Sequence, residues 1–134
     1  MNTIADTSIW SLFFRRKRRQ RSPEVTIFRE LIQTGQISLP GIIKQELLSG
    51  IREETQYQKL KDLLSSFPAL LATEEDHILA SLYFNQCRRK GIQGSFVDFL
   101  ICAQSTNNQM MILTTDKDFD SYAKVLDLHL LKKN

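Results

Sequence analysis

The sequence predicts an α/β domain in which short strands alternate with helices. Short apolar runs are separated by longer stretches with helical periodicity, and residues that favour caps and turns lie between them. The run at 110–114 is continuously apolar before its end, which is typical of a strand buried on both faces in the centre of a parallel sheet. With 134 residues, 42% hydrophobic and 25% charged, the chain has the size of a single domain spanning residues 1–134.

The first half of the chain is expected to begin with a strand at Thr3–Ala5. Asp6 stops this strand, and its side-chain oxygen can cap a helix at 9–14. Ser22 and Pro23 have the cap and first-turn chemistry of a second helix. The remaining elements of this half are a strand at 37–39, a helix from about 41 to 50, a helix at 54–66 and a strand at 69–72.

The second half is expected to contain three helices and two strands. Thr73 is followed by three acidic residues, as at a helix start, and this helix should end before Gly91. Ser95 opens the next helix, which should reach about residue 105 before a polar turn at 106–109. The last elements are the strand at 110–114, a short helix at 118–125 and a strand at 128–131.

The charge of the chain is concentrated in one segment. The net charge of the whole chain is +3. Six of the basic residues lie within residues 15–21, and without them the chain has 12 basic and 15 acidic residues, a net charge of −3. The six are Arg15, Arg16, Lys17, Arg18, Arg19 and Arg21. Cations this close repel one another, which favours an anionic partner such as nucleic-acid phosphate. The alternative is a solvated loop with no partner. We call this segment the basic strip.

The cysteines and the apolar runs indicate a protein of the cytoplasm. Cys87 and Cys102 are 15 residues apart and form no C-x-x-C motif, which suits reduced thiols. The apolar stretch at 9–14 is too short for a signal peptide and precedes the positive charges. No run reaches transmembrane length, so no membrane association is expected.

Two aspartates follow expected strands. Asp6 comes directly after the first strand, and Asp116 comes two residues after the strand at 110–114. Binding sites of open parallel sheets lie beyond the carboxyl ends of the strands, so both are candidates. Taken singly, Asp6 is equally well explained as a helix cap and Asp116 as a turn residue.

Two further acids interrupt apolar helices. Helical spacing places Glu46 between Ile42 and Ile43, in the apolar arc of its helix, unless its stem lies flat and its carboxylate reaches solvent. Asp98 interrupts the run at 96–103, which is apolar on nearly all sides and therefore expected to be buried. A buried carboxylate must be neutralised, paired or bound to a cation.

Four carboxylates at one sheet edge would repel one another, and burial would raise their pKa values. A divalent metal ion resolves this repulsion. An all-oxygen ligand set suits Mg²⁺ or Mn²⁺, whereas His77 and His129 lack zinc-site spacing to each other or to either cysteine. Such a site can activate water and stabilise a phosphodiester during in-line attack.

Four segments carry recognisable motifs: 6–10 (DTSIW), 45–52 (QELLSGIR), 94–101 (GSFVDFLI) and 113–119 (LTTDKDF). Together they resemble the PIN domain, and within it the VapC-type toxins of bacterial toxin–antitoxin pairs. Each segment alone is a weak signal, but their order and spacing cover almost the whole chain. The resemblance implies a three-layer α/β/α sandwich with a central parallel sheet, and Mg²⁺- or Mn²⁺-dependent endonucleolytic cleavage of RNA.

The resemblance also implies roles for individual residues. The family's acidic quartet would be Asp6, Glu46, Asp98 and Asp116, with Asp118 as an auxiliary acid and with Thr7 and Thr115 supporting the site. Under the hypothesis of a metal-dependent endoribonuclease, Glu46 would hold a second ion or orient the attacking water, and the basic strip would bind RNA phosphates.

The partners implied are an RNA substrate, a VapB-like antitoxin whose tail occludes the pocket, and a second copy of the chain. Promoter DNA would be bound only through the antitoxin complex. The basic strip departs from the family by its density of charge, which leaves RNA, antitoxin tail and promoter DNA open as its partner. The alternative function is a non-catalytic module that binds nucleic acid or protein, although four retained carboxylates argue against it.

Overall fold

A four-stranded parallel sheet forms the centre of the molecule. The structure is a computed structural model, and it describes residues 2–15 and 22–132. The strands are β1 (Thr3–Ala5), β2 (Ile37–Pro40), β3 (Ala69–Leu70) and β4 (Met111–Leu113), in the spatial order β3-β2-β1-β4. Thr3 pairs with Ile37 on one side and with Met111 on the other, so β1 lies between two parallel neighbours. The predicted parallel sheet is confirmed.

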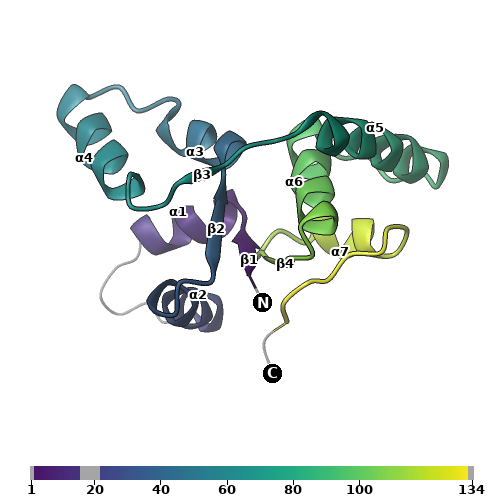
Figure 1. Cartoon of the computed structure of the whole chain (residues 1–134), viewed down its shortest axis with the longest axis horizontal. Helices are drawn as coiled ribbons and strands as arrows, with labels where there is room; N and C mark the ends of the chain where they lie inside the picture. Colours follow the sequence, from purple (N-terminus) through teal and green to yellow (C-terminus); the bar gives the residue numbers. More distant parts are fainter. Residues whose placement is uncertain (1, 16–21, 133–134) are drawn as a thin grey trace.

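Helices connect the strands and cover the sheet (Figure 1). They are α1 (Thr7–Arg15), α2 (Pro23–Gln33), α3 (Gly41–Leu48), α4 (Glu54–Leu64), α5 (Glu74–Arg89), α6 (Phe96–Asn107) and α7 (Asp118–Ala123). In Figure 1, α1 and α4 lie on one side of the sheet and α5 and α6 on the other. The expected three-layer α/β/α architecture is therefore confirmed.

Two helix starts follow the predicted capping chemistry. The hydroxyl of Ser22 accepts a hydrogen bond from the backbone N–H of Val25, and Pro23 occupies the first helical position of α2. At the start of α5, Thr73 and Asp76 form a reciprocal capping box. These local contacts explain why the helix starts were visible in the sequence.

The core joins the strands to aromatic side chains of the helices. Ile4 and Ile112 of adjacent strands are fully buried, and the indole of Trp10 packs against Phe28 and Phe67 with ring centroids 4.8 and 5.1 Å away. Cys87 and Cys102 are buried free thiols, as the sequence predicts. This core fixes β1 and β4, the strands from which the candidate site is built.

Several predicted elements differ from the structure, and the largest difference is at the C-terminal end. The segment at 128–131 is not a strand but forms one parallel bridge, between Leu130 and Ile112. Two backbone hydrogen bonds make this bridge: Leu131 N–H donates to Ile112 O, and Ile112 N–H donates to His129 O. Because no strand of the described part of the chain pairs with β4 on that side, β4 is an edge strand of the four-stranded sheet and not the central strand that its apolar sequence predicts. Helix α6 continues to Asn107, whose amide bonds Asp76.

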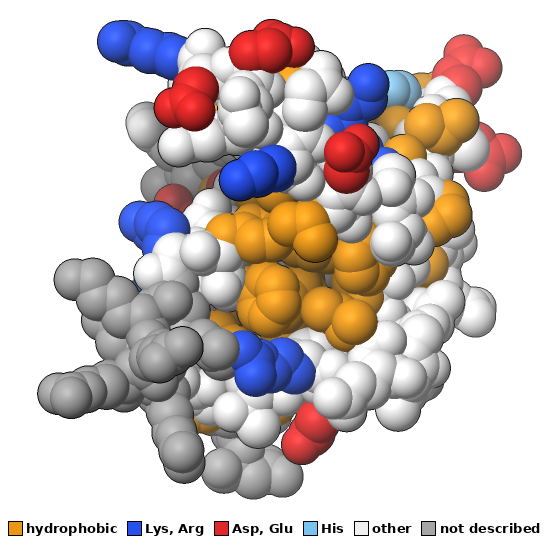
Figure 2. Space-filling model, turned by 90° about the vertical axis from the view of Figure 1, so that its left-hand side faces the viewer, with side chains coloured by type: hydrophobic (Ala, Val, Ile, Leu, Met, Phe, Trp, Pro, Cys, Tyr) orange, Lys and Arg blue, Asp and Glu red, His pale blue; other side chains and the backbone are white. Residues whose placement is uncertain are grey.

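Hydrophobic side chains gather on the face shown in Figure 2, the side of the molecule on which α1 and α4 lie. Phe14 of α1 is 37% exposed and Leu63 of α4 is 60% exposed. A second set of exposed hydrophobic side chains belongs to α5 and α6 and comprises Ile78, Leu82 and Phe96. Within the described part of the chain, no helix combines the length and the hydrophobicity needed to cross a membrane.

Candidate metal centre

The site lies where β1 and β4 end side by side. The strands are parallel neighbours, so their carboxyl ends share one edge of the sheet, and Asp6 N–H donates to Leu113 O at 3.1 Å across that edge. Helix α6 packs against both strands and brings its first turn to the same place. The hydroxyl of Ser95 caps this helix by accepting from the backbone N–H of Asp98 at 3.0 Å.

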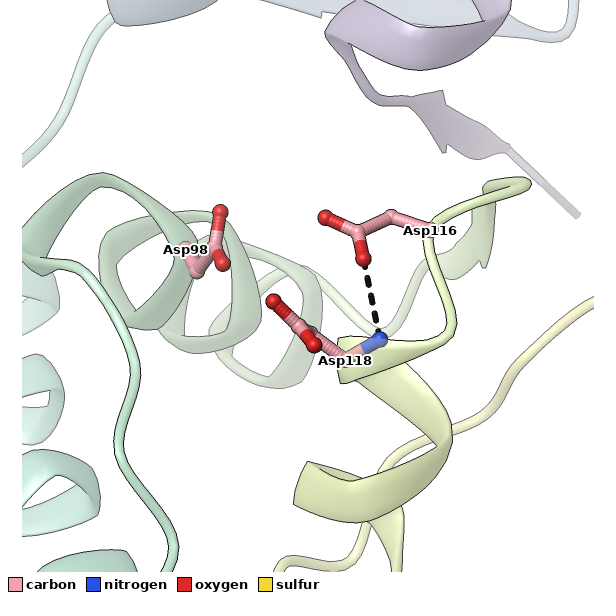
Figure 3. A group of neighbouring side chains, drawn as sticks. All are labelled: Asp98, Asp116 and Asp118. Atoms are coloured by element: carbon pink, nitrogen blue, oxygen red, sulfur yellow. Dashed lines mark hydrogen bonds between the residues drawn. The ribbon is translucent and has the colours of Figure 1, made fainter.

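Three carboxylates converge at this edge (Figure 3). Asp98 comes from α6, Asp116 from the loop after β4, and Asp118 from the start of α7; one oxygen of each lies within 4.8 Å of the other two. The backbone N–H of Asp118 donates to Asp116 Oδ1 at 2.9 Å, which fixes the loop that carries both. Among residues 2–15 and 22–132, no basic side chain forms an ion pair with these three carboxylates. Their charges are therefore left without a cationic partner from the described chain.

Asp6 lies next to this cluster and is held by hydroxyl groups. Its side chain is 5% exposed; Ser8 donates to Oδ1, and Thr114 donates to Oδ2 at 2.6 Å. Burial raises the pKa of Asp6 above its ordinary value, and the charge of Asp116 adds to this, whereas the two hydroxyl hydrogen bonds oppose it. The carboxylate is thus oriented by neutral donors, which leave its charge uncompensated.

Thr114 connects the two strand ends. Its hydroxyl donates to Asp6 and accepts from the backbone N–H of Asp116 at 2.9 Å. Thr115, the residue that the family resemblance singled out, contributes its backbone N–H, which donates to Ser8 Oγ at 3.1 Å. Sequence reasoning missed Ser8 and Thr114 as site residues, although both lie directly beside the strand ends that located Asp6 and Asp116.

Asp98 is partly buried and is bonded to a tyrosine. The hydroxyl of Tyr122, on α7, donates to Asp98 Oδ2 at 2.7 Å. Burial raises the pKa of Asp98, and the charges of Asp116 and Asp118 raise it further, while the tyrosine hydrogen bond lowers it. Burial and the bond to Asp98 raise the pKa of Tyr122 above its usual range, so the phenol stays protonated and donates. No sequence motif indicates a role for Tyr122, because its contact with Asp98 joins two different helices.

Glu46 does not lie in a buried stripe, contrary to the prediction. It is exposed, because α3 is only eight residues long and buries Ile43 alone among its side chains. Its carboxylate accepts a hydrogen bond from the hydroxyl of Thr7 at 2.8 Å, and Thr7 directly follows Asp6. In the described part of the chain, the group of carboxylates whose oxygens lie within 4.8 Å of one another comprises Asp98, Asp116 and Asp118, and Glu46 is not part of it.

Of the basic strip, the structure describes only its first residue. Arg15 ends α1, is exposed, and donates from Nε to Ser11 O at 3.3 Å. The other five cations lie outside the described residues: Arg16, Lys17, Arg18, Arg19 and Arg21.

Comparison with known proteins identifies the family of the chain. The model of the PIN domain family matches residues 3–125. The chain belongs to the PIN domain family. PIN domains are nucleases, hydrolases that act on nucleic acids. None of the curated proteins compared with the chain matches it.

Solved structures share the PIN fold over the whole chain. VapBC2 from Rickettsia felis, bound to a DNA fragment from its promoter, has a TM-score of 0.79 at 16% identity and covers 100% of both chains. FitAcB from Neisseria gonorrhoeae has a TM-score of 0.75 at 16% identity, covering 97% of this chain and 96% of that one. VapBC-1 from nontypeable Haemophilus influenzae has a TM-score of 0.72 at 17% identity, covering 98% of each.

The donor set of this PIN domain fits a hard divalent cation. PIN nucleases generally use divalent metals, and the clustered ligand atoms here are all carboxylate oxygens. Oxygen-only sets suit Mg²⁺ and Mn²⁺, whereas zinc favours nitrogen and sulfur. The two histidines are elsewhere: His77 lines a cavity between α5 and α6, and His129 lies beside Ser105 and Asp127.

Proposed function

We propose that the protein is a metal-dependent endoribonuclease and the VapC-type toxin of a toxin–antitoxin pair. The observation that carries this proposal is the convergence of three carboxylates within 4.8 Å at the carboxyl edge of the sheet of a PIN domain. Uncompensated acids at that spacing repel one another, which is costly unless the site serves to bind a cation. The solved toxin–antitoxin structures with the same fold support the toxin assignment.

In this proposal Asp6, Asp98 and Asp116 hold Mg²⁺ or Mn²⁺, with Asp118 as an auxiliary ligand. When bound, the ion lowers the pKa of water to give a nucleophile at neutral pH and stabilises charge on the phosphodiester. Glu46, whose carboxylate accepts a hydrogen bond from the hydroxyl of Thr7, holds a second ion or orients the attacking water. The hydroxyls of Ser8 and Thr114 keep Asp6 in one orientation, so the ligands are in place before substrate arrives.

The RNA chain would be gripped by the basic strip. Arg15 lies at the end of α1, the helix that follows Asp6 directly, so the strip starts on an element that leads away from the site. Six cations within residues 15–21 are enough to neutralise several phosphates and release their counterions. In this proposal the carboxylate cluster binds the metal ion and the basic strip binds the phosphates of the substrate.

The proposed protein partners are a VapB-like antitoxin and a second copy of the chain. Structures with the same fold are described as VapBC complexes, and one of them is bound to promoter DNA. The apolar face of α1 and α4 (Figure 2) and the exposed Ile78, Leu82 and Phe96 of α5 and α6 are surfaces of the kind that partners cover. Promoter DNA would be bound only through the antitoxin complex. The toxin would act on RNA in the cytoplasm.

The test is cleavage of total RNA by the purified protein. We expect discrete fragments with Mg²⁺ or Mn²⁺, and none with EDTA or in the Asp98→Asn variant. The matched control is Asp62→Asn, because Asp62 is an exposed acid on α4, and this variant should cleave like the wild type. Fragments that persist in EDTA or in Asp98→Asn contradict the metal mechanism, and RNA binding without cleavage would favour the non-catalytic module.

A further inference from the structure

Tyr122 is the one phenol that reaches the acidic cluster among the described residues, and nothing in the proposed function uses it. The side chain is fully buried, yet its hydroxyl donates to Asp98 Oδ2 at 2.7 Å. The two residues belong to different helices, α7 and α6, and are 24 positions apart in the chain. A buried hydroxyl aimed at a carboxylate of the site is therefore a product of the tertiary structure.

The packing around Tyr122 fixes where its hydroxyl lies. Its ring contacts Phe99 and Phe119 with centroids 4.9 and 5.3 Å away. A Cβ atom at Gly94 would lie 2.6 Å from the Tyr122 hydroxyl and 2.8 Å from the Phe99 ring. Only glycine at position 94 leaves room for the hydroxyl, so the segment before α6 is shaped to let the phenol reach Asp98.

The hydrogen bond restricts the carboxylate of Asp98. Asp116 and Asp118 place negative charge on the side that Asp98 faces (Figure 3), and this repulsion favours rotation of the carboxylate away from the cluster. A charge-assisted bond from a rigid phenol opposes that rotation. It does so without adding a positive charge that would compete with a bound cation.

We propose that Tyr122 is a positioning residue, which holds Asp98 in the orientation that binds the divalent cation. The inference rests on the proposed function, because it assigns a role within the proposed metal site. Tyr122 acts through Asp98 and not on the substrate. Groups that hold metal ligands in this way typically contribute about tenfold to metal affinity.

The test compares two tyrosine-to-phenylalanine variants by calorimetric titration with Mn²⁺. Tyr122→Phe removes the hydroxyl and keeps the ring. The matched control is Tyr83→Phe, which removes a hydroxyl that donates to Thr106 Oγ1 at 2.9 Å and does not contact the three clustered carboxylates. We expect Mn²⁺ affinity to fall about tenfold in Tyr122→Phe and to stay unchanged in Tyr83→Phe. Raising the Mn²⁺ concentration should restore cleavage by Tyr122→Phe, with an unchanged KM for RNA.

The outcomes separate the inference from the proposed function. Wild-type Mn²⁺ affinity in a folded Tyr122→Phe variant, with binding lost in Asp98→Asn, overturns the positioning role and leaves the metal site intact. Absence of Mn²⁺ binding by the wild-type protein overturns the proposed function together with this inference. A lowered Tm with unchanged Mn²⁺ affinity shows a purely structural role for Tyr122 and also overturns the proposal.

Discussion

At the residue scale, neutral hydroxyls orient the acids of this site. Ser8 and Thr114 donate to Asp6, Tyr122 donates to Asp98, and Thr7 donates to Glu46. A lysine or arginine in these places would form an ion pair and weaken the attraction of the pocket for a metal ion. Hydroxyl donors fix geometry and leave the negative charge available.

Replacing Thr114 by valine tests whether a hydroxyl donor orients Asp6. The substitution keeps the shape of the side chain but removes the donor to Asp6 and the acceptor for Asp116 N–H. We expect metal-dependent RNA cleavage to fall about tenfold or more. The comparison is Thr115→Val, where the backbone N–H that bonds Ser8 is retained, so the loss should be smaller. Equal losses in initial cleavage rate would contradict the assignment of the hydroxyl of Thr114 to the site.

At the element scale, helix starts are specified by a few local contacts. The capping box of α5 is the best example, since Asp76 is 2% exposed and also accepts from the Asn107 amide at 2.8 Å. Burial alone would raise the pKa of Asp76, but hydrogen bonds from Thr73 N–H and Asn107 outweigh it and hold the pKa below its ordinary value. This residue therefore joins α5 to the end of α6.

The lowered pKa of Asp76 predicts a pH-dependent stability. A carboxyl group whose pKa is lower in the folded than in the unfolded state stabilises the fold at pH values above its unfolded-state pKa, which is about 3.9 for aspartate. This stabilisation is lost as the pH falls through the pKa of the folded state. Asp76→Asn should therefore lower the free energy of unfolding by about 1 kcal/mol at pH 7, with a smaller difference below pH 4. Urea denaturation at several pH values measures this.

The control for Asp76→Asn is Glu75→Gln. Glu75 is an exposed acid in the same first turn of α5, so its loss should cost less than about 0.5 kcal/mol. A difference between wild type and Asp76→Asn that does not shrink at low pH would show that the ionised carboxylate is not the stabilising species.

At the scale of the whole molecule, the chain carries a cluster of acids and a basic strip. The net charge of +3 conceals both features, because the strip contributes six positive charges and the rest of the chain has a net charge of −3. Burial and mutual repulsion disfavour the ionised forms of Asp6 and Asp98, whose pKa values are raised. The carboxylates thus lower the stability of the fold at neutral pH, and a bound cation would reverse this.

Metal removal should accordingly destabilise the whole domain. A cation that binds only the folded state at about 100 times its Kd adds about 2.7 kcal/mol to the free energy of unfolding. We expect Tm at pH 7 to rise by several degrees with Mn²⁺ relative to EDTA, and we expect this rise to be lost in Asp98→Asn. A thermal shift by Mn²⁺ that survives in Asp98→Asn would place the stabilising metal outside the carboxylate cluster.

The sequence by itself determined most of the elements and the places of most acids. Caps such as Ser22 and Thr73 act within one helical turn, and Asp6 and Asp116 are placed by the strand ends they follow, so short-range chemistry was sufficient. The prediction that Glu46 is buried was wrong. Periodicity indicates which face of a helix is apolar, but the burial of a side chain depends on which elements pack against the helix, and α3 has only eight residues.

Only the tertiary structure decided how the acids are held. The bond from Thr114 to Asp6 spans 108 positions, and the bond from Tyr122 to Asp98 depends on the space left by Gly94. The strand expected at 128–131 became a single bridge for the same kind of reason, since pairing is set by the neighbouring strand and not by the local run. Local propensity is written in consecutive residues, whereas hydrogen bonds between distant segments exist only once the sheet and its helices are packed.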